Sequence, residues 1–263
     1  MYNFDVVKPT RIADAVKELL DRSESQPLGG GQTLIPTLKQ RLARPDKLVS
    51  LAGIDEMKGV CKGEDGSDCI GGATTHATVT AEAGAYPALA ATAAHIGDPA
   101  VRNRGTIGGS LANNDPSACY PAAALASGAT IKTNAREIAA DDYFQGMFTT
   151  ALEEGEIITE VRFPVPEKAN YQKFVQPASR FALVGVFVAK YADGVRVAIT
   201  GASNDGVFRW TEAEAALSAN FAPDAIEGLS LSGDDMISDL HGTGVYRAHL
   251  CTVLTKRAVA AAE

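Results

Sequence analysis

Metal-binding side chains are scarce in this sequence: 263 residues contain only four cysteines and four histidines. No cysteines form a C-x-x-C pair or a spacing typical of iron–sulfur clusters. There is no H-E-x-x-H motif, and no two histidines have metal-ligand spacing on one helix. We therefore expect reduced, mostly buried thiols and no metal in this chain. The cysteines are Cys61, Cys69, Cys119 and Cys251, and the histidines are His76, His95, His241 and His249.

Positive charge and long apolar runs are also lacking. The chain has 24 Lys and Arg against 32 Asp and Glu, a net charge of −8. This balance argues against nucleic acid as a partner, because nucleic-acid binding needs a basic face. No apolar run approaches the ~20 residues that span a bilayer. The N-terminus, MYNFDVVKPT, has no basic region followed by an apolar one, so we expect no secretion signal and a cytoplasmic location.

Common nucleotide and hydrolase motifs are missing as well. No G-x-G-x-x-G follows a strand, which argues against a Rossmann site. There is no G-x-x-x-x-G-K-[ST] and no G-x-S-x-G, which excludes a P-loop and a nucleophile elbow. We also find no residue pattern that suggests a catalytic acid–base pair, so we assign no catalytic residues. The 46% hydrophobic and 21% charged residues fit a globular protein with a substantial core.

Two glycine-rich stretches stand out against these absences. Residues 97–116 read GDPAVRNRGTIGGSLANNDP, and residues 29–33 read GGGQT just before a helical pattern that begins at Leu34. Glycine lets the backbone approach a ligand closely, and free N–H groups at a helix start favour a phosphate. A single such stretch is more often a tight structural turn. Two of them, each followed by a helical pattern, favour a phosphate-bearing ligand, and we predict that both converge on one diphosphate.

The pattern divides the chain into three units, 1–53, 54–166 and 167–263. The boundary near Pro164-Val165-Pro166 is the clearest, because proline restricts both its own backbone and the preceding residue. We expect residues 97–116 to form a loop. In the last unit three strands are expected, at 171–175, 182–190 and 195–201, with a hairpin turn at Asp193-Gly194. Helices are expected at 211–218 and 244–262.

Several segments together resemble one protein family, the FAD-binding medium subunits of molybdenum hydroxylases. The segment Gly29–Pro36, GGGQTLIP, resembles the family signature AGG-x-S-L-I-P. The segments HIGD…VRNRGTIGGS at 95–110 and IGGATTH at 70–76 resemble two further signatures, and QPASRFA at 176–182 resembles the start of the family's C-terminal domain. The resemblance covers nearly the whole chain and is strongest to medium subunits of aerobic carbon monoxide dehydrogenase, within the xanthine dehydrogenase family.

The resemblance implies an α+β fold: two α/β subdomains that clasp FAD, of the vanillyl-alcohol-oxidase type, and a C-terminal domain with a three-stranded antiparallel sheet and helices. It implies FAD contacts from both glycine-rich segments and a few residues beyond them. Diphosphate and ribityl contacts are expected from Gly30, Gly31, Gln32 and Thr33, further diphosphate contacts from Thr106, Gly109 and Ser110, and adenosine contacts from Ala112 and Asp115. Ile157 or Ile158 should touch the flavin or adenine, Phe181 should cover the isoalloxazine, and Gly29, Leu34, Thr75 and Gly108 complete the expected set.

One position departs from the family pattern. Many relatives have an acidic residue where this chain has Cys119, and a thiol is a poor acceptor for a ribose hydroxyl. Asp115 is a substitute acceptor, but Asp115-Pro116 is also a good helix cap followed by a first helical residue. Both interpretations stay open for Asp115. Lys173 could lie near the flavin pyrimidine, although a solvated strand lysine is the simpler interpretation.

The resemblance also implies partners. A molybdopterin-binding large subunit would oxidise the substrate, and a small subunit with two [2Fe–2S] clusters would relay electrons to the FAD, in a heterotrimer that dimerises. The substrate stays open among carbon monoxide, aldehydes, purines and other N-heterocycles, and so does the final acceptor. Two other functions remain: a free-standing small flavin oxidoreductase, and a scaffold that has lost its cofactor.

Overall fold

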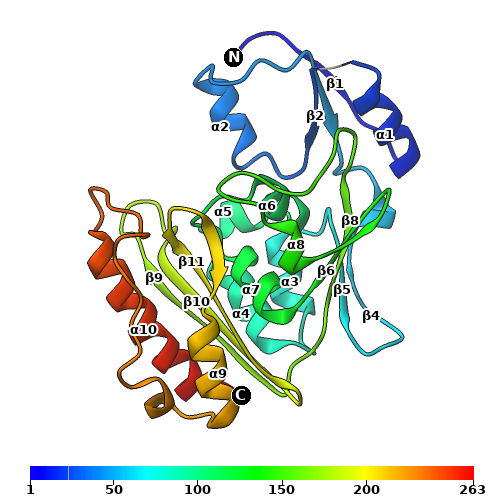
Figure 1. Ribbon diagram of the computed structural model, residues 1–263. Helices are drawn as coiled ribbons and strands as arrows, with labels where there is room; N and C mark the ends of the chain where they lie inside the picture. Colours follow the sequence, from blue (N-terminus) through cyan, green and yellow to red (C-terminus); the bar gives the residue numbers. More distant parts are fainter. Residues whose placement is uncertain (23) are drawn as a thin grey trace.

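The computed structural model describes residues 1–22 and 24–263 and contains three β-sheets (Figure 1). The first sheet, in the order β1-β3-β2, is parallel and lies near the N-terminus. Helix α1 packs on it through Ala15 and Leu19, which lie one helical turn apart. The elements are β1 (Asp5–Val7), α1 (Ile12–Leu20), β2 (Ser25–Leu28), α2 (Leu34–Lys39) and β3 (Lys47–Ser50).

The second sheet is antiparallel, in the order β4-β5-β8-β6-β7. Most of the helices between β5 and β8 gather beside it, between the first and third sheets (Figure 1). Its strands are β4 (Val60–Lys62), β5 (Asp68–Gly71), β6 (Thr130–Thr133), β7 (Glu137–Ala139) and β8 (Ile158–Phe163). The helices are α3 (His76–Glu82), α4 (Pro87–Ala94), α5 (Pro99–Arg102), α6 (Ile107–Asn113), α7 (Tyr120–Ser127) and α8 (Ala140–Tyr143).

The third sheet has four antiparallel strands, where the sequence predicted three. The missed strand is β12, only four residues long, paired with β11 through an irregular register after a polar turn. Such a segment resembles a loop in sequence. The predicted Asp193-Gly194 hairpin is confirmed between β10 and β11. The elements are β9 (Lys168–Val175), β10 (Ala182–Tyr191), β11 (Gly194–Ser203), β12 (Gly206–Arg209), α9 (Thr211–Ala219) and α10 (Gly244–Ala261), with short 3-10 helices at Asp55–Met57 and Pro223–Ile226.

Residues 97–116 are not simply a loop, as the sequence predicted, because they contain α5 and α6. Glycines lower intrinsic helix propensity, which is why the prediction was wrong. Here side-chain caps compensate: Asp98 Oδ1 accepts from Val101 N at 2.9 Å, and Thr106 Oγ1 accepts from Gly109 N at 3.2 Å. The start of α6 is also fixed from outside, since Gly108 N donates to Gly72 O at 2.9 Å.

The core continues across the expected boundary near residue 166. Helix α7 is buried along its whole length, and its small side chains let it pack closely against β10 and β11. Helix α4 contacts β9 on this same face, while α9 and α10 cover the other face of the third sheet (Figure 1). No helix among the described residues is both long and apolar enough to cross a membrane. The division into three units stays a prediction.

Candidate functional site

A cavity of about 570 Å³ lies where the three parts of the chain meet. This volume is typical of sites for small molecules and cofactors. Its walls come from segments 26–34, 105–119, 152–158 and 173–181. Every residue that the sequence predicted as a cofactor contact lines this cavity except Thr75. Thr75 instead caps α3, accepting from Thr78 N at 3.2 Å, and lines a smaller neighbouring cavity of about 280 Å³.

The two glycine-rich segments meet at one wall of the cavity. A Cβ on Gly30 would lie 2.0 Å from the carbonyl oxygen of Arg104, and one on Gly29 would lie 2.9 Å from Thr106 Oγ1. Neither position has room for a side chain unless the opposing segment moves. Gly31 has φ +73°, which strains any other residue. The backbone of Gly30 is therefore held directly against that of Arg104 and Gly105.

Gly108 and Gly109 are glycines for two different steric reasons. A Cβ on Gly108 would lie 2.6 Å from the carbonyl oxygen of Gly72, so Gly108 allows α6 to pack on the segment after β5. Gly109 is exposed, and within 4 Å its Cβ would meet only Thr106 Oγ1, at 2.9 Å. Because Gly109 lines the cavity, its missing side chain leaves space for a ligand instead of space for the protein.

His76 lines the cavity beneath this wall and is 4% exposed. Its ring lies 5.3 Å from that of Tyr120, and a Cβ on Gly105 would lie 2.5 Å from its Nε2. Burial, with a smaller effect of Arg102, lowers the pKa of His76 to about 4, so the ring is neutral near pH 7. Its buried Nδ1 has no hydrogen-bond partner among the described residues. Because Nδ1 is itself buried, the cavity wall contains His76 as a neutral, packed ring.

Lys173 and Cys119 form the wall near β9. Lys173 Nζ donates to the carbonyl oxygen of His95 at 2.8 Å and to Cys119 Sγ at 3.4 Å. Lys173 is thus fixed in the cavity wall, and the interpretation as a solvated strand lysine was wrong. Burial, with smaller effects of Lys173 and Arg102, lowers the pKa of His95.

Asp115 is not a helix cap, because α7 begins only at Tyr120. Its Oδ1 accepts from Ser117 N at 2.9 Å, which closes a turn, and burial raises the pKa of its carboxyl group. Asp115 also lines the cavity. Of the two interpretations, the helix cap was wrong and the ligand contact stays a prediction, with which the turn is compatible.

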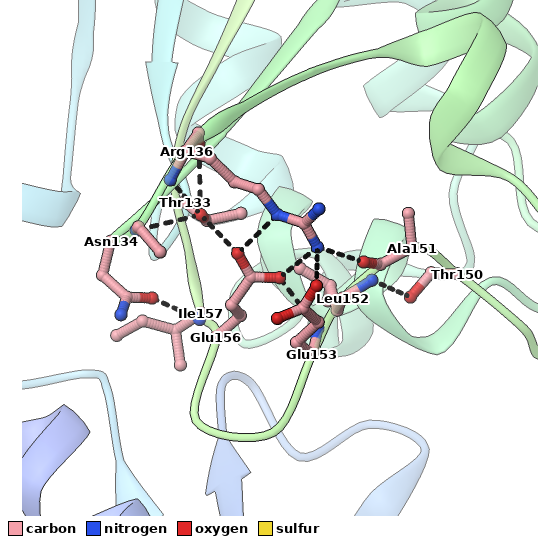
Figure 2. A network of polar contacts seen from close by, with 10 residues as sticks. Thr133, Asn134, Arg136, Thr150, Ala151, Leu152, Glu153, Glu156 and Ile157 are labelled. Carbon is pink, nitrogen blue, oxygen red and sulfur yellow. Dashed lines mark hydrogen bonds and ion pairs between the residues drawn. The ribbon is translucent and has the colours of Figure 1, made fainter.

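The part of the cavity wall around Glu156 and Ile157 is held by a network of ion pairs and hydrogen bonds (Figure 2). Arg136 Nε donates to Glu156 Oε1 at 2.9 Å and Nη2 donates to Oε2 at 3.0 Å, a bidentate pair. The same guanidinium donates to the carbonyl oxygen of Ala151 at 2.7 Å. Asn134 Oδ1 accepts from Ile157 N at 2.8 Å. Together these contacts fix the backbone that presents Ile157 and Ile158 to the cavity.

Phe181 lies at the rim, 44% exposed, in a tight loop between β9 and β10. Gln176 N donates to the carbonyl oxygen of Phe181 at 2.9 Å, and Arg180 has φ +61°, which marks a strained turn. The sequence analysis missed His76, Glu156 and the fixed position of Lys173 as parts of the site. The role of each residue depends on contacts with residues far away in the sequence. Only His76 had a signal in the sequence, because it lies in a family signature.

Comparison with known proteins identifies the family of this chain. The family described as "FAD binding domain in molybdopterin dehydrogenase" matches residues 2–166. The carbon monoxide dehydrogenase medium chain of Afipia carboxidovorans is 34% identical over 283 residues, with 99% of this chain and 97% of the relative covered. The nicotine 6-hydroxylase medium subunit of Paenarthrobacter nicotinovorans is also 34% identical, with 95% and 94% covered.

Solved structures show the same likeness. Reconstituted CO dehydrogenase from Oligotropha carboxidovorans contains a chain that superposes with a TM-score of 0.89 at 31% identity, covering 98% of this chain and 97% of that one. The predicted α+β fold class is confirmed by this match, apart from the strand number of the third sheet. The chain therefore belongs to the family of FAD-binding medium subunits of molybdenum hydroxylases, and it is an oxidoreductase flavoprotein subunit.

Proposed function

We propose that this chain holds FAD between the [2Fe–2S] clusters of a small partner subunit and an external electron acceptor. A molybdopterin-binding large subunit would complete the complex, as a dimer of heterotrimers. The observation that carries the proposal is the cavity between two glycine-rich segments, in a chain that matches medium chains along almost its full length. When bound, FAD supplies the ability to accept and release electrons, and this chain positions it.

The residues of the cavity fit FAD. The crowding around Gly29 and Gly30 and the open space at Gly109 leave backbone N–H groups as the surface for a diphosphate. Thr106 and Ser110 add hydroxyl groups to the same wall. Apolar Leu28, Ile157 and Ile158 supply surface for the flavin.

The adenosine half would occupy the part of the cavity near Asp115 and Ser117. We propose that Asp115 accepts from a ribose hydroxyl, while Cys119 is engaged by Lys173 and makes no such contact. The Lys173 ammonium carries a positive charge into the same end of the cavity, where it attracts an anionic or electron-rich ligand group. Phe181, at the rim, is proposed to cover one face of a ligand ring.

This chain does not choose the substrate. Relatives of equal identity are named for different reactions, of carbon monoxide and of nicotine. We propose that the complex is of the carbon monoxide dehydrogenase type, because the likeness to that medium chain covers 99% of this chain and 97% of the relative. The proposal that the chain acts only in a complex does not depend on this choice.

The test is expression of the chain alone and together with the products of neighbouring genes. Alone, it should carry non-covalent FAD that acid releases, with neither molybdenum nor iron and no turnover of substrate. With its partners it should co-elute with both metals and show substrate-dependent reduction of its flavin. Turnover by the metal-free isolated chain would instead support a free-standing flavin oxidoreductase, and a chain that cannot be loaded with FAD would support the scaffold function. Native mass spectrometry and metal analysis distinguish these outcomes.

A further inference from the structure

Three potential metal ligands meet on the second sheet, outside the flavin cavity. Cys61 on β4 lies directly opposite Cys69 on β5, and Glu160 on β8 lies opposite Gly71 of the same strand β5. The two sulfur atoms and a carboxylate oxygen of Glu160 all lie within 4.8 Å of one another. The sequence analysis excluded a metal from spacing along the chain, but seven residues separate the cysteines and pairing of the strands brings them together.

The distances among the two sulfur atoms and the carboxylate oxygen suit a small thiophilic cation. A tetrahedral zinc ion with bonds of about 2.3 Å to sulfur holds two sulfur ligands about 3.8 Å apart. Cys69 is 4% exposed while Cys61 is exposed, so one ligand is fixed inside the sheet and the other leaves access from solvent. Two thiols with one carboxylate form a donor set that selects zinc over magnesium or calcium.

Neighbouring groups already orient these ligands. Arg162 Nε donates to Glu160 Oε1 at 2.8 Å, and its Nη1 pairs with Glu137 at 2.9 Å. A metal-ligating carboxylate is commonly held by such an outer hydrogen bond, and here Oε2 remains for the ion. Ser67 Oγ lies 3.7 Å from Cys69 Sγ and donates to Asp65 Oδ1 at 2.6 Å. Asp65 and the Glu160–Arg162 ion pair therefore lie beside the Cys69 thiol.

We propose that Cys61, Cys69 and Glu160 form a zinc site with water as the fourth ligand. The ion would join β4, the edge strand, to β5 and β8. Two thiols would release their protons when the ion binds, so that thiolates become the ligands. The edge strand β4 has only three residues and therefore few backbone hydrogen bonds. A zinc ion that binds the folded sheet but not the unfolded chain would stabilise the folded sheet by mass action. This site is independent of the flavin cavity and of the proposed electron path.

The experiment uses the full chain loaded with FAD and reduced under anaerobic conditions. Zinc is added and counted by native mass spectrometry, and cobalt(II) then serves as the optical probe. One zinc per chain is expected. Cobalt(II) bound by thiolates should give charge-transfer bands. A tetrahedral cobalt site should also give ligand-field bands, which lie at longer wavelengths than the flavin absorption. Cys61→Ser, Cys69→Ser and Glu160→Gln should each weaken metal binding by about tenfold or more.

Glu137→Gln is the matched control, because it removes the other partner of Arg162 but no ligand. Its zinc affinity should stay within about twofold of the parent, well inside the effect of losing a ligand. Flavin content and thermal melting report whether each variant remains folded. The proposal is overturned if the reduced parent takes up no zinc, or if Cys61→Ser and Cys69→Ser together leave uptake unchanged. A cysteine pair that only forms a disulfide, with no metal uptake after reduction, overturns it as well.

Discussion

The two main walls of the flavin cavity are fixed by different physical means. The glycine wall, residues 29–31 and 104–109, is set by close backbone approach: a Cβ would overlap backbone atoms of Arg104 at Gly30 and of Gly72 at Gly108. The second, side-chain wall, around Glu156 and Ile157, is set by side chains that donate and accept hydrogen bonds. Substitution in the first wall should act through steric overlap and have abrupt effects. Substitution in the second should act through lost polar contacts and have graded ones.

The largest effect is expected from Gly30→Val. Its Cβ would lie 2.0 Å from the backbone oxygen of Arg104, which cannot rotate away as a side chain can. We expect loss of FAD binding together with roughly 3 kcal/mol or more of stability, the upper end of overpacking costs. Denaturant unfolding and flavin content measure the two effects. Gly84→Val is the control, because Gly84 is exposed with no atom within 4 Å of its Cβ position; equal effects in both variants would contradict the comparison.

Gly109→Val separates ligand binding from folding within the same wall. The new side chain meets only Thr106 Oγ1 in the protein and otherwise enters the cavity. We expect FAD binding to be abolished, while stability falls by only about 1 kcal/mol through disturbance of the Thr106 cap. Flavin retention on gel filtration and circular dichroism test this difference. A variant that binds FAD with unchanged affinity would place the diphosphate elsewhere.

His76 makes the glycine wall sensitive to pH. Its folded pKa is about 4, below the unfolded value of 6.5, so between these values only the unfolded chain binds a proton. The free energy of unfolding should therefore decrease as pH falls from about 6.5 to about 4, by about 3 kcal/mol in total. His76→Gln should remove this part of the pH dependence in the FAD-free chain. Replacement of the exposed His249 should leave it in place, and an unchanged profile in His76→Gln would exclude His76 as its source.

The difference between the walls also explains what the sequence could predict. The glycine wall was predictable because close backbone approach requires glycine, and the family signatures contain those positions. The same glycines made residues 97–116 look like a loop, so the sequence did not predict α5 and α6. These helices are stabilised by the Asp98 and Thr106 caps and not by intrinsic helix propensity.

The side-chain wall was less predictable. Glu156 is one of many carboxylates in this acidic chain, and its partner Arg136 lies twenty residues earlier. Lys173 was uncertain because its contacts with His95 and Cys119 require β9 to lie beside α4. Contacts of this kind depend on tertiary packing, which a local pattern does not encode. The assignment of individual residues to FAD atoms stays a prediction.

Of the substitutions in the two walls that should impair FAD binding, Arg136→Met in the side-chain wall should impair it least. The Arg136 side chain is 42% exposed, so solvent weakens its ion pair with Glu156. The Glu156 side chain is only 5% exposed, so its carboxylate cannot become fully hydrated when the pair is lost. Removing the guanidinium leaves that carboxylate with fewer donors, at a cost of about 1–2 kcal/mol. Ile157 should shift with it, so FAD should bind more weakly but still bind.

The pH profile identifies the cause of that loss. Arg136, as the main contributor, lowers the pKa of Glu156 in the folded chain. A lowered carboxyl pKa gives stability that is present above the unfolded pKa and is lost as pH falls through the folded one. Arg136→Met should therefore cost less at acidic pH than at pH 7, and Glu156→Gln should remove most of this difference. Glu153→Gln is the matched control, because its carboxylate also pairs with Arg136 but is 75% exposed, and it should change stability by less than about 0.5 kcal/mol. If Arg136→Met costs the same at every pH and also abolishes FAD binding, the two walls do not differ in the way proposed, and steric shape governs both.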